Sequence, residues 1–108
     1  MAEYEVELTS GAEGDLEHLF MDTLERAGEG SARGLLDELW KSIKSLRQNP
    51  LRRAVPSQLR ALGVLEYRQM LSGPYRLLFK VEEQRVIIYL IAHEKRDFRS
   101  LLERRLLR

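Results

Sequence analysis

The sequence contains no cysteine and only two histidines, and both shortages limit its chemistry. Without cysteine the chain can form neither disulfides nor thiolate metal sites. His18 and His93 lie far apart and lack the spacing of a pair of metal ligands. We therefore predict no metal site and no cofactor.

Long apolar runs are absent as well. No stretch approaches the roughly 20 residues that a membrane-spanning helix needs, and the acidic start of the chain is unlike a signal peptide. No internal repeat or low-complexity segment divides the 108 residues, a length that suits one domain. We expect a single cytoplasmic domain, residues 1–108, that does not contact a membrane.

Positive charge is scarce in the first part of the chain, although the net charge is only +1. Residues 1–30 hold nine acidic side chains and one basic side chain, whereas the remainder holds 17 basic and eight acidic ones. This segregation favours an anionic partner for the later part, and nucleic acid is the usual one. Alternatively, the two sets of charges lie across from each other on the surface.

The most informative stretch is residues 75–97. Alternation predicts a half-buried strand at residues 75–81, and the apolar run at residues 85–93 is typical of a strand near the middle of a sheet. The polar break between them predicts a tight hairpin. An arginine lies early in the first strand, and a histidine ends the second.

Apolar periodicity predicts the remaining elements. Ser10 with Glu13 forms a candidate capping box, and Ser31 can cap a second helix. Residues 50–63 have no clear period and are interpreted as a connection. The order β-α-α-β-β-β-α predicts an α+β fold in two layers, with a helical hairpin packed on one face of a mostly antiparallel sheet. Strands are expected at 4–8 and 64–71, and helices at 12–27, from 31 to about 48, and after 97.

Strand register decides which side chains share a face. A symmetric turn at residues 82–85 pairs Arg76 with Ile91, so that Arg76, Ile91 and His93 point the same way. For residues 72–74, a three-residue turn pairs Met70 with Arg76. A two-residue turn pairs Leu71 with Arg76 and exposes apolar side chains, so burial favours the three-residue turn.

This register assigns residues to two faces. The predicted core face comprises Leu65, Tyr67, Leu71, Tyr75, Leu77, Phe79, Val81, Val86, Ile88, Leu90 and Ala92. The predicted second face comprises Glu66, Arg68, Met70, Arg76, Leu78, Lys80, Ile87, Tyr89, Ile91 and His93. The second face is too apolar to stay in water. We expect the C-terminal segment or a partner to cover it.

With these residues in view, the chain resembles the RelE/ParE superfamily of type II toxins. The resemblance covers nearly the whole chain and is strongest in YRLLFKV and in RVIIYLIAHEKRD, which ends in H-x-x-R-D. It implies a RelE-like fold and a growth-arresting toxin, of the kind linked to plasmid stabilisation, that a cognate antitoxin neutralises in a hetero-oligomer. RelE-like members cleave messenger RNA on the ribosome, whereas ParE-like members inhibit DNA gyrase.

The resemblance also implies roles for particular residues. Arg76 and Arg96 match arginines of the nucleases, Lys95 matches the basic residue before the second arginine, and His93 matches a histidine that some relatives use as a general acid. With Glu66 as base, these groups would suffice for a metal-independent endoribonuclease. Candidate RNA- or target-binding residues are Arg68, Lys80, Lys95 and Arg99, and candidate antitoxin-binding residues are Leu78, Ile87, Tyr89 and Ile91.

Three departures favour the ParE-like interpretation. Tyr67 and Gln69 stand near the positions of a lysine pair in RelE, Leu102 stands near its C-terminal tyrosine, and the helical hairpin is longer than in RelE. We expect gyrase inhibition, with the messenger RNA nuclease and a non-toxic binding module as alternatives. His93 and Arg76 also have structural interpretations, Glu66 could pair with Lys80 on the surface, and His18 is expected to face solvent.

Overall fold

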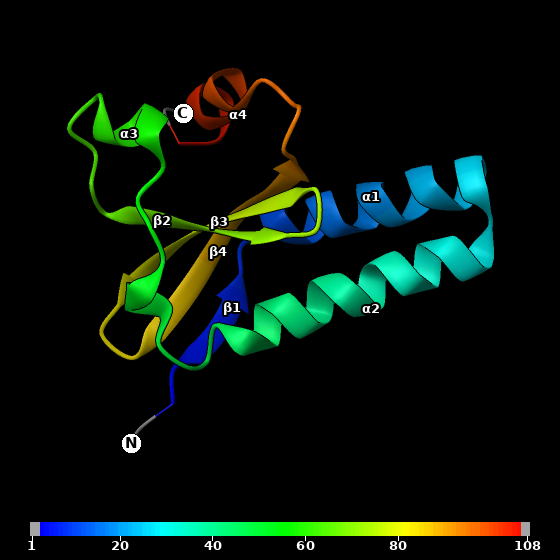
Figure 1. Ribbon diagram of the computed structural model, residues 1–108, viewed down its shortest axis with the longest axis horizontal. Coiled ribbons are helices and arrows are strands. Elements are labelled where there is room, and N and C mark those ends of the chain that lie inside the picture. The colour runs from blue at the N-terminus through cyan, green and yellow to red at the C-terminus, as the bar shows by residue number, and fades with distance from the viewer. Residues whose placement is uncertain (1–2, 107–108) are drawn as a thin grey trace.

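The molecule is built on a four-stranded sheet, shown in the computed structural model of Figure 1. The structure describes residues 3–106. The strands are β1 (Glu5–Leu8), β2 (Tyr67–Ser72), β3 (Tyr75–Glu82) and β4 (Arg85–His93), in the order β1-β4-β3-β2. β1 runs parallel to β4, and the other neighbours are antiparallel. The predicted α+β fold with a mostly antiparallel sheet is confirmed.

Two long helices, α1 (Ser10–Ala27) and α2 (Glu29–Ser45), form the predicted hairpin. They lie side by side against one face of the sheet (Figure 1). The predicted caps are wrong: Thr9 caps α1 by accepting from the Ala12 amide at 3.1 Å, and α2 follows Gly28 without a side-chain cap. Gly28 has a φ of 91°, a conformation that glycine adopts without strain, so the chain reverses there within one residue.

The connection between α2 and β2 is more ordered than its sequence suggested. It holds a 3-10 turn, η1 (Pro50–Arg52), and a short helix, α3 (Ser57–Arg60). The amide of Gln69 donates to the carbonyl of Ala54 at 2.9 Å, which ties the connection to the outer edge of β2. β2 begins at Tyr67, three residues later than predicted. Among residues 3–106, no helix is long and apolar enough to span a bilayer.

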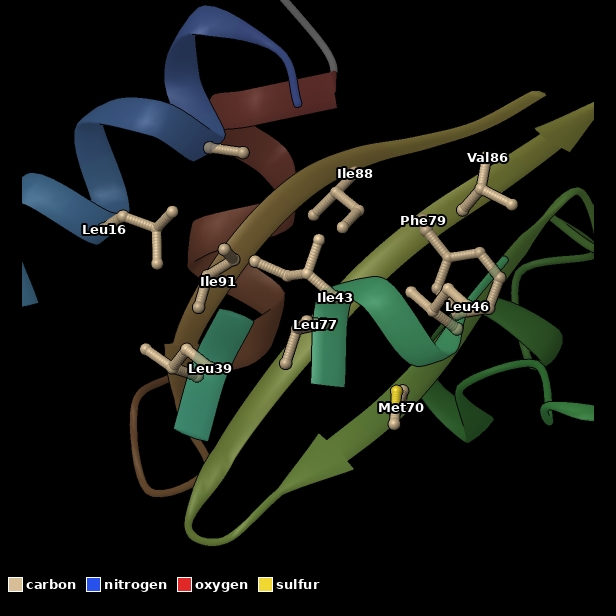
Figure 2. Packing of buried hydrophobic residues seen from close by; sticks show 11 residues of the cluster. Leu16, Leu39, Ile43, Leu46, Met70, Leu77, Phe79, Val86, Ile88 and Ile91 are labelled. Atoms are coloured by element: carbon tan, nitrogen blue, oxygen red, sulfur yellow. The ribbon is translucent and has the colours of Figure 1, made fainter. Parts of the chain in front are cut away.

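The main core fills the space between the hairpin and the sheet. Leu39 and Ile43 of α2, with Leu46 directly after the helix, lie over Leu77 and Phe79 of β3, as Figure 2 shows. Burying a side chain of this size contributes about 1.5–3 kcal/mol, so this layer supplies much of the driving force for folding. The remaining buried members are Ala12, Leu16, Met70, Val86, Ile88 and Ile91.

A second, smaller core covers the opposite face of the sheet. The C-terminal helix α4 (Phe98–Leu106) places Phe98 and Leu102 over Leu78 and Leu90, and Leu59 of α3 joins them. Figure 1 shows α3 and α4 near each other above the sheet. The C-terminal segment therefore covers this face, one of the two covers expected from the sequence.

The predicted turn between β2 and β3 is wrong. The turn has two residues, Gly73 and Pro74, and Leu71 lies opposite Arg76. The prediction assumed that apolar side chains belong on one face, but α4 gives the second face a core of its own. Gly73 adopts a φ of 58°, which suits so tight a turn. Tyr67 therefore packs on the α4 side, and Leu71 is 56% exposed.

The predicted register between β3 and β4 is right near the turn and wrong beyond a β-bulge. Phe79 pairs with Ile88, but Leu78 pairs with Leu90, so Tyr89 has no opposite residue. One inserted residue turns all later side chains of β4 to the other face. Through the two-residue turn and the bulge together, the core face was wrong for Leu65, Tyr67, Leu71, Leu90 and Ala92, and the second face was wrong for Arg68, Met70, Ile91 and His93.

Candidate functional site

Arg76 lies under the first turn of α4. It pairs with Leu71 on one side and Ala92 on the other, and its guanidinium carbon is 4.4 Å from the centre of the Phe98 ring. A guanidinium in that position is attracted by the aromatic face. Within the described residues, its Nε is buried without a hydrogen-bond partner. Arg76 thus helps to hold α4 and keeps an unused donor.

His93 ends β4 on the hairpin side of the sheet, opposite Tyr75. The two rings pack edge to face, with their centres 5.4 Å apart. Its Nδ1 accepts a hydrogen bond from the Lys95 amide at 3.1 Å. This bond assigns the proton of the neutral ring to Nε2, the one ring donor left for another group.

The four candidate catalytic residues do not converge. Because of the bulge, Arg76 and His93 project from opposite faces, although they were expected to share one. Glu66 lies in a bend before β2 and lines a cleft of about 500 Å³ with Arg99; we name it the α3–α4 cleft. Arg96 lines a different cavity with His93, of about 720 Å³; we name it the α1–α4 groove.

The α3–α4 cleft is mainly apolar. Its walls include Leu59, Val64 and Leu106, and Tyr67 stands at its side. Burial, followed by the charge of neighbouring Tyr89, raises the pKa of the Tyr67 hydroxyl above 10.0. The Tyr67 hydroxyl is therefore a neutral hydrogen-bonding group at physiological pH and has no catalytic charge.

Most of the candidate binding cations already have partners. Arg68 Nη1 donates to the carbonyl of Arg53 at 2.7 Å, and Arg99 pairs with Glu103 at 3.4 Å. Lys80 pairs with Glu82 at 3.0 Å, not with Glu66, and this hydrogen bond raises the pKa of Lys80 above 10.5. Lys95 is exposed in the turn after β4.

The candidate antitoxin-binding set does not form a free surface. Leu78 and Ile91 are buried in the two opposite cores, because α4 covers the first and the bulge turns the second toward the hairpin. Ile87 and Tyr89 are partly exposed. An apolar groove over the hairpin lies elsewhere. It measures about 490 Å³, runs between α1 and α2 and is lined by Phe20, Leu36 and Trp40; we name it the hairpin groove.

The contents of the α1–α4 groove were not predicted from the sequence. His18 of α1 is exposed, as expected, and it also lines this groove. Asp15 and Arg105 form an ion pair at 2.9 Å, and Gly11 leaves room for the arginine: a Cβ there would lie 2.9 Å from Arg105 Nη1. His18 follows Asp15 by about one helical turn, so both side chains lie on the same side of α1. An inward-facing Asp15 would therefore have indicated that His18 lies beside the groove.

Comparison with known proteins supports this fold. The chain matches a structure titled as the chromosomal ParDE toxin–antitoxin system from P. aeruginosa, with a TM-score of 0.69 and 18% identity over 84% of this chain and 96% of that one. It also matches the toxin–antitoxin complex RelBE2 from Mycobacterium tuberculosis, with a TM-score of 0.62 and 21% identity over 84% and 98%. No curated protein sequence gives a significant match.

A family model decides the assignment. It describes the ParE toxin of the type II toxin–antitoxin system parDE, and it matches residues 6–98, which include both the hairpin and the sheet. The chain therefore belongs to the ParE toxin family.

Proposed function

We propose that this toxin arrests bacterial growth by binding DNA gyrase rather than by cleaving messenger RNA. The observation that carries the proposal is the placement of Arg76 and His93 on opposite faces of the sheet. Cleavage through a 2′-hydroxyl needs a base, an acid and cations around one phosphate. With Glu66 in a third location, these residues offer no such arrangement.

The surroundings of His93 support the same proposal. His93 Nδ1 accepts from the Lys95 amide, so Nε2 is the ring nitrogen that is free to meet a partner. One hydrogen-bonding nitrogen at the end of β4 suits a binding role.

One observation favours the alternative, a metal-independent messenger RNA endonuclease on the ribosome. His93 and Arg96 line the same groove, so an acid and a cation could meet one phosphate there. The base would have to come from another residue than Glu66. This alternative predicts cuts in ribosome-bound message that depend on His93.

We further propose that a cognate antitoxin neutralises the toxin in a hetero-oligomer and covers the hairpin groove. Both similar structures come from toxin–antitoxin systems. Trp40 at the rim of this groove is 39% exposed, and Phe20 and Leu36 lie beside it. Exposed tryptophan in an apolar groove is typical of an interface anchor. An amphipathic helix of the antitoxin would fit there.

Two assays separate the proposals. Purified toxin should inhibit gyrase supercoiling and leave ribosome-bound message intact, and His93→Gln should change the inhibition by less than about threefold, as expected for a residue without a catalytic role. A nuclease that uses His93 as its acid should lose about 10²–10⁴ in rate in this variant. Site-specific cuts that vanish with His93→Gln would replace the gyrase proposal with the nuclease. If neither activity is found and wild-type expression does not slow growth, the chain is a non-toxic binding module.

A further inference from the structure

The α1–α4 groove lies where the sheet is incomplete. β1 ends at Leu8, opposite Ile88, so within residues 3–106 no strand lies beside the last residues of β4 on that edge. Instead α1 and α4 flank the edge, and the groove of about 720 Å³ runs between them; the elements can be followed in Figure 1. His93 lies at the β4 end, and His18 lies on the α1 wall.

The charged groups of the groove leave an excess of positive charge. Asp15 is neutralised by Arg105, and Asp22 by Arg26, at 2.9 Å in both cases. Two further arginines, Arg96 and Arg104, line the groove and form no ion pair within residues 3–106. The groove therefore offers two unneutralised guanidinium groups from different elements.

Imidazole and backbone donors add to these cations. His93 Nδ1 is occupied by the Lys95 amide, which leaves Nε2 as the donor of the ring. The amide of Ile91 faces this edge and is capped by Asp15 at 2.9 Å. Alternate residues of a strand direct their amides to the same edge, so the amide of His93 faces the groove too.

We propose that the α1–α4 groove binds the phosphate group of a nucleotide, with His18, His93, Arg96 and Arg104 as donors. A phosphate has three or more acceptor oxygens pointing in different directions, which matches donors from α1, β4 and α4. A carboxylate is planar, and one arginine fork satisfies it. The two carboxylates at this site are already paired in that way.

The size and the apolar lining fit a nucleotide better than a bare anion. Sites for small molecules typically have volumes of about 300–1,000 Å³, and the groove lies within this range. Leu19, Tyr75 and Leu101 provide apolar surface for a base or sugar. The ligand can be a free nucleotide or one phosphate of a nucleic acid strand. This binding site goes beyond the proposed action on gyrase and does not depend on it. Its strand form would also serve the nuclease alternative, which the supercoiling and message-cleavage assays test separately.

The test is a titration of the purified full-length chain, followed by calorimetry and by the side-chain NMR signals of the two histidines. The probes are inorganic phosphate, adenosine monophosphate, a trinucleotide and, as the carboxylate probe, acetate. We expect adenosine monophosphate to bind with a Kd below about 1 mM and to shift the signals of both His18 and His93. A free-nucleotide site binds the monophosphate at least as tightly as the trinucleotide, whereas a strand site binds the trinucleotide more tightly.

Variants locate the binding. Arg104→Gln should weaken it by about tenfold or more, as expected for the loss of a charge-assisted hydrogen bond, and His18→Gln by a smaller factor. Arg33→Gln is the matched control, because Arg33 is exposed on α2, paired with Glu29 and outside the groove. The proposal is overturned if Arg33→Gln weakens binding as much as Arg104→Gln. It is also overturned if acetate binds as tightly as phosphate, or if neither histidine signal moves.

Discussion

Asp15 and Arg105, from the first and last helices, form a two-pronged ion pair around the bulge of β4. Arg105 Nη1 lies 3.0 Å from Asp15 Oδ2, and Arg105 Nη2 lies 2.9 Å from Oδ1. The same groups serve the backbone: Asp15 accepts from the Ile91 amide at 2.9 Å, and Arg105 donates to the Tyr89 carbonyl at 2.6 Å. One pair of side chains thus satisfies the bulge and joins α4 to the rest of the fold.

Asp15→Ala should destabilise the protein by about 1.5–3 kcal/mol, because it leaves the Ile91 amide and a guanidinium without their acceptor. The Asp15 side chain is only 18% exposed, so water compensates poorly. Urea unfolding measures the change. Asp22→Ala is the control, since the Asp22–Arg26 pair is at least 60% exposed and should contribute less than about 1 kcal/mol. Equal effects of the two changes would contradict the role of Asp15.

Two glycines of α1 should respond oppositely to alanine. A methyl group at Gly14 would meet open space, so Gly14→Ala should stabilise the helix by about 0.5–1 kcal/mol. A methyl group at Gly11 would lie 2.9 Å from Arg105 Nη1, and two hydrogen bonds hold that atom in place. Gly11→Ala should therefore destabilise the protein. Thermal unfolding of the two variants, side by side, tests this difference in sign.

α4 should loosen at acid pH. Hydrogen bonds from Ser100, first from its side chain and then from its amide, lower the pKa of Asp97 below 3.8. A carboxyl group whose pKa falls on folding stabilises the folded state above its unfolded pKa. That contribution is lost as the pH falls below 3.8 through the folded pKa. Amide exchange in α4 should speed up over this range. In Asp97→Ala, α4 should already exchange faster at about pH 6, where the carboxylate of the wild type is fully charged, and this acid-dependent step should be missing.

Growth arrest should depend on Arg76 and Arg96, the two arginines that the resemblance matched to arginines of the nucleases. Wild-type expression should stop growth, whereas Arg76→Ala combined with Arg96→Ala should not, at equal amounts of soluble protein. Arg33→Ala combined with Lys41→Ala removes the same charge from exposed, ion-paired positions of α2 and should leave toxicity intact. If the first double variant is folded and still toxic, the toxic surface lies elsewhere, and the hairpin is the next candidate.

Trp40 provides a direct readout of antitoxin binding, because it is the single tryptophan of the sequence. If the antitoxin covers the hairpin groove, tryptophan emission should move to shorter wavelength in the complex. Phe20→Ala should weaken the complex by about tenfold, as expected for an interface anchor. Leu62→Ala, at a 64% exposed position in the α3–α4 cleft, is the control. Unchanged emission in a stable complex would place the antitoxin elsewhere.

Local patterns predicted the fold because its main elements are local. The hairpin of β3 and β4 follows from the alternation before residues 82–85 and the apolar run after them, and the helical hairpin follows from periodic leucines interrupted by Gly28. The C-terminal helix after Asp97 was predicted in the same way. The α+β class needed only these elements and their order.

The arrangement of the site could not be predicted in this way. The bulge at Tyr89 depends on Asp15 and Arg105, whose side chains are distant in sequence and serve the unpaired backbone groups. A register predicted from the strands alone takes no account of such partners. One inserted residue was enough to place His93 and Arg76 on opposite faces of the sheet. The prediction of the turn at Gly73 failed for a related reason. When both faces of a sheet are buried, burial gives no preference between the two registers.

The parallel pairing of β1 with β4 has a consequence for how the chain folds. Glu5 lies beside Arg85 and Leu8 beside Ile88, so the first strand has no partner until residues 85–88 have been synthesised. The helical hairpin and the strands β2 to β4 close over short distances in sequence, whereas this contact closes a long loop and is expected to form late. During synthesis, the edge of β1 is expected to stay unpaired while the helices that follow it form. A ribosome that stops before residue 85 thus releases a chain that cannot complete its sheet.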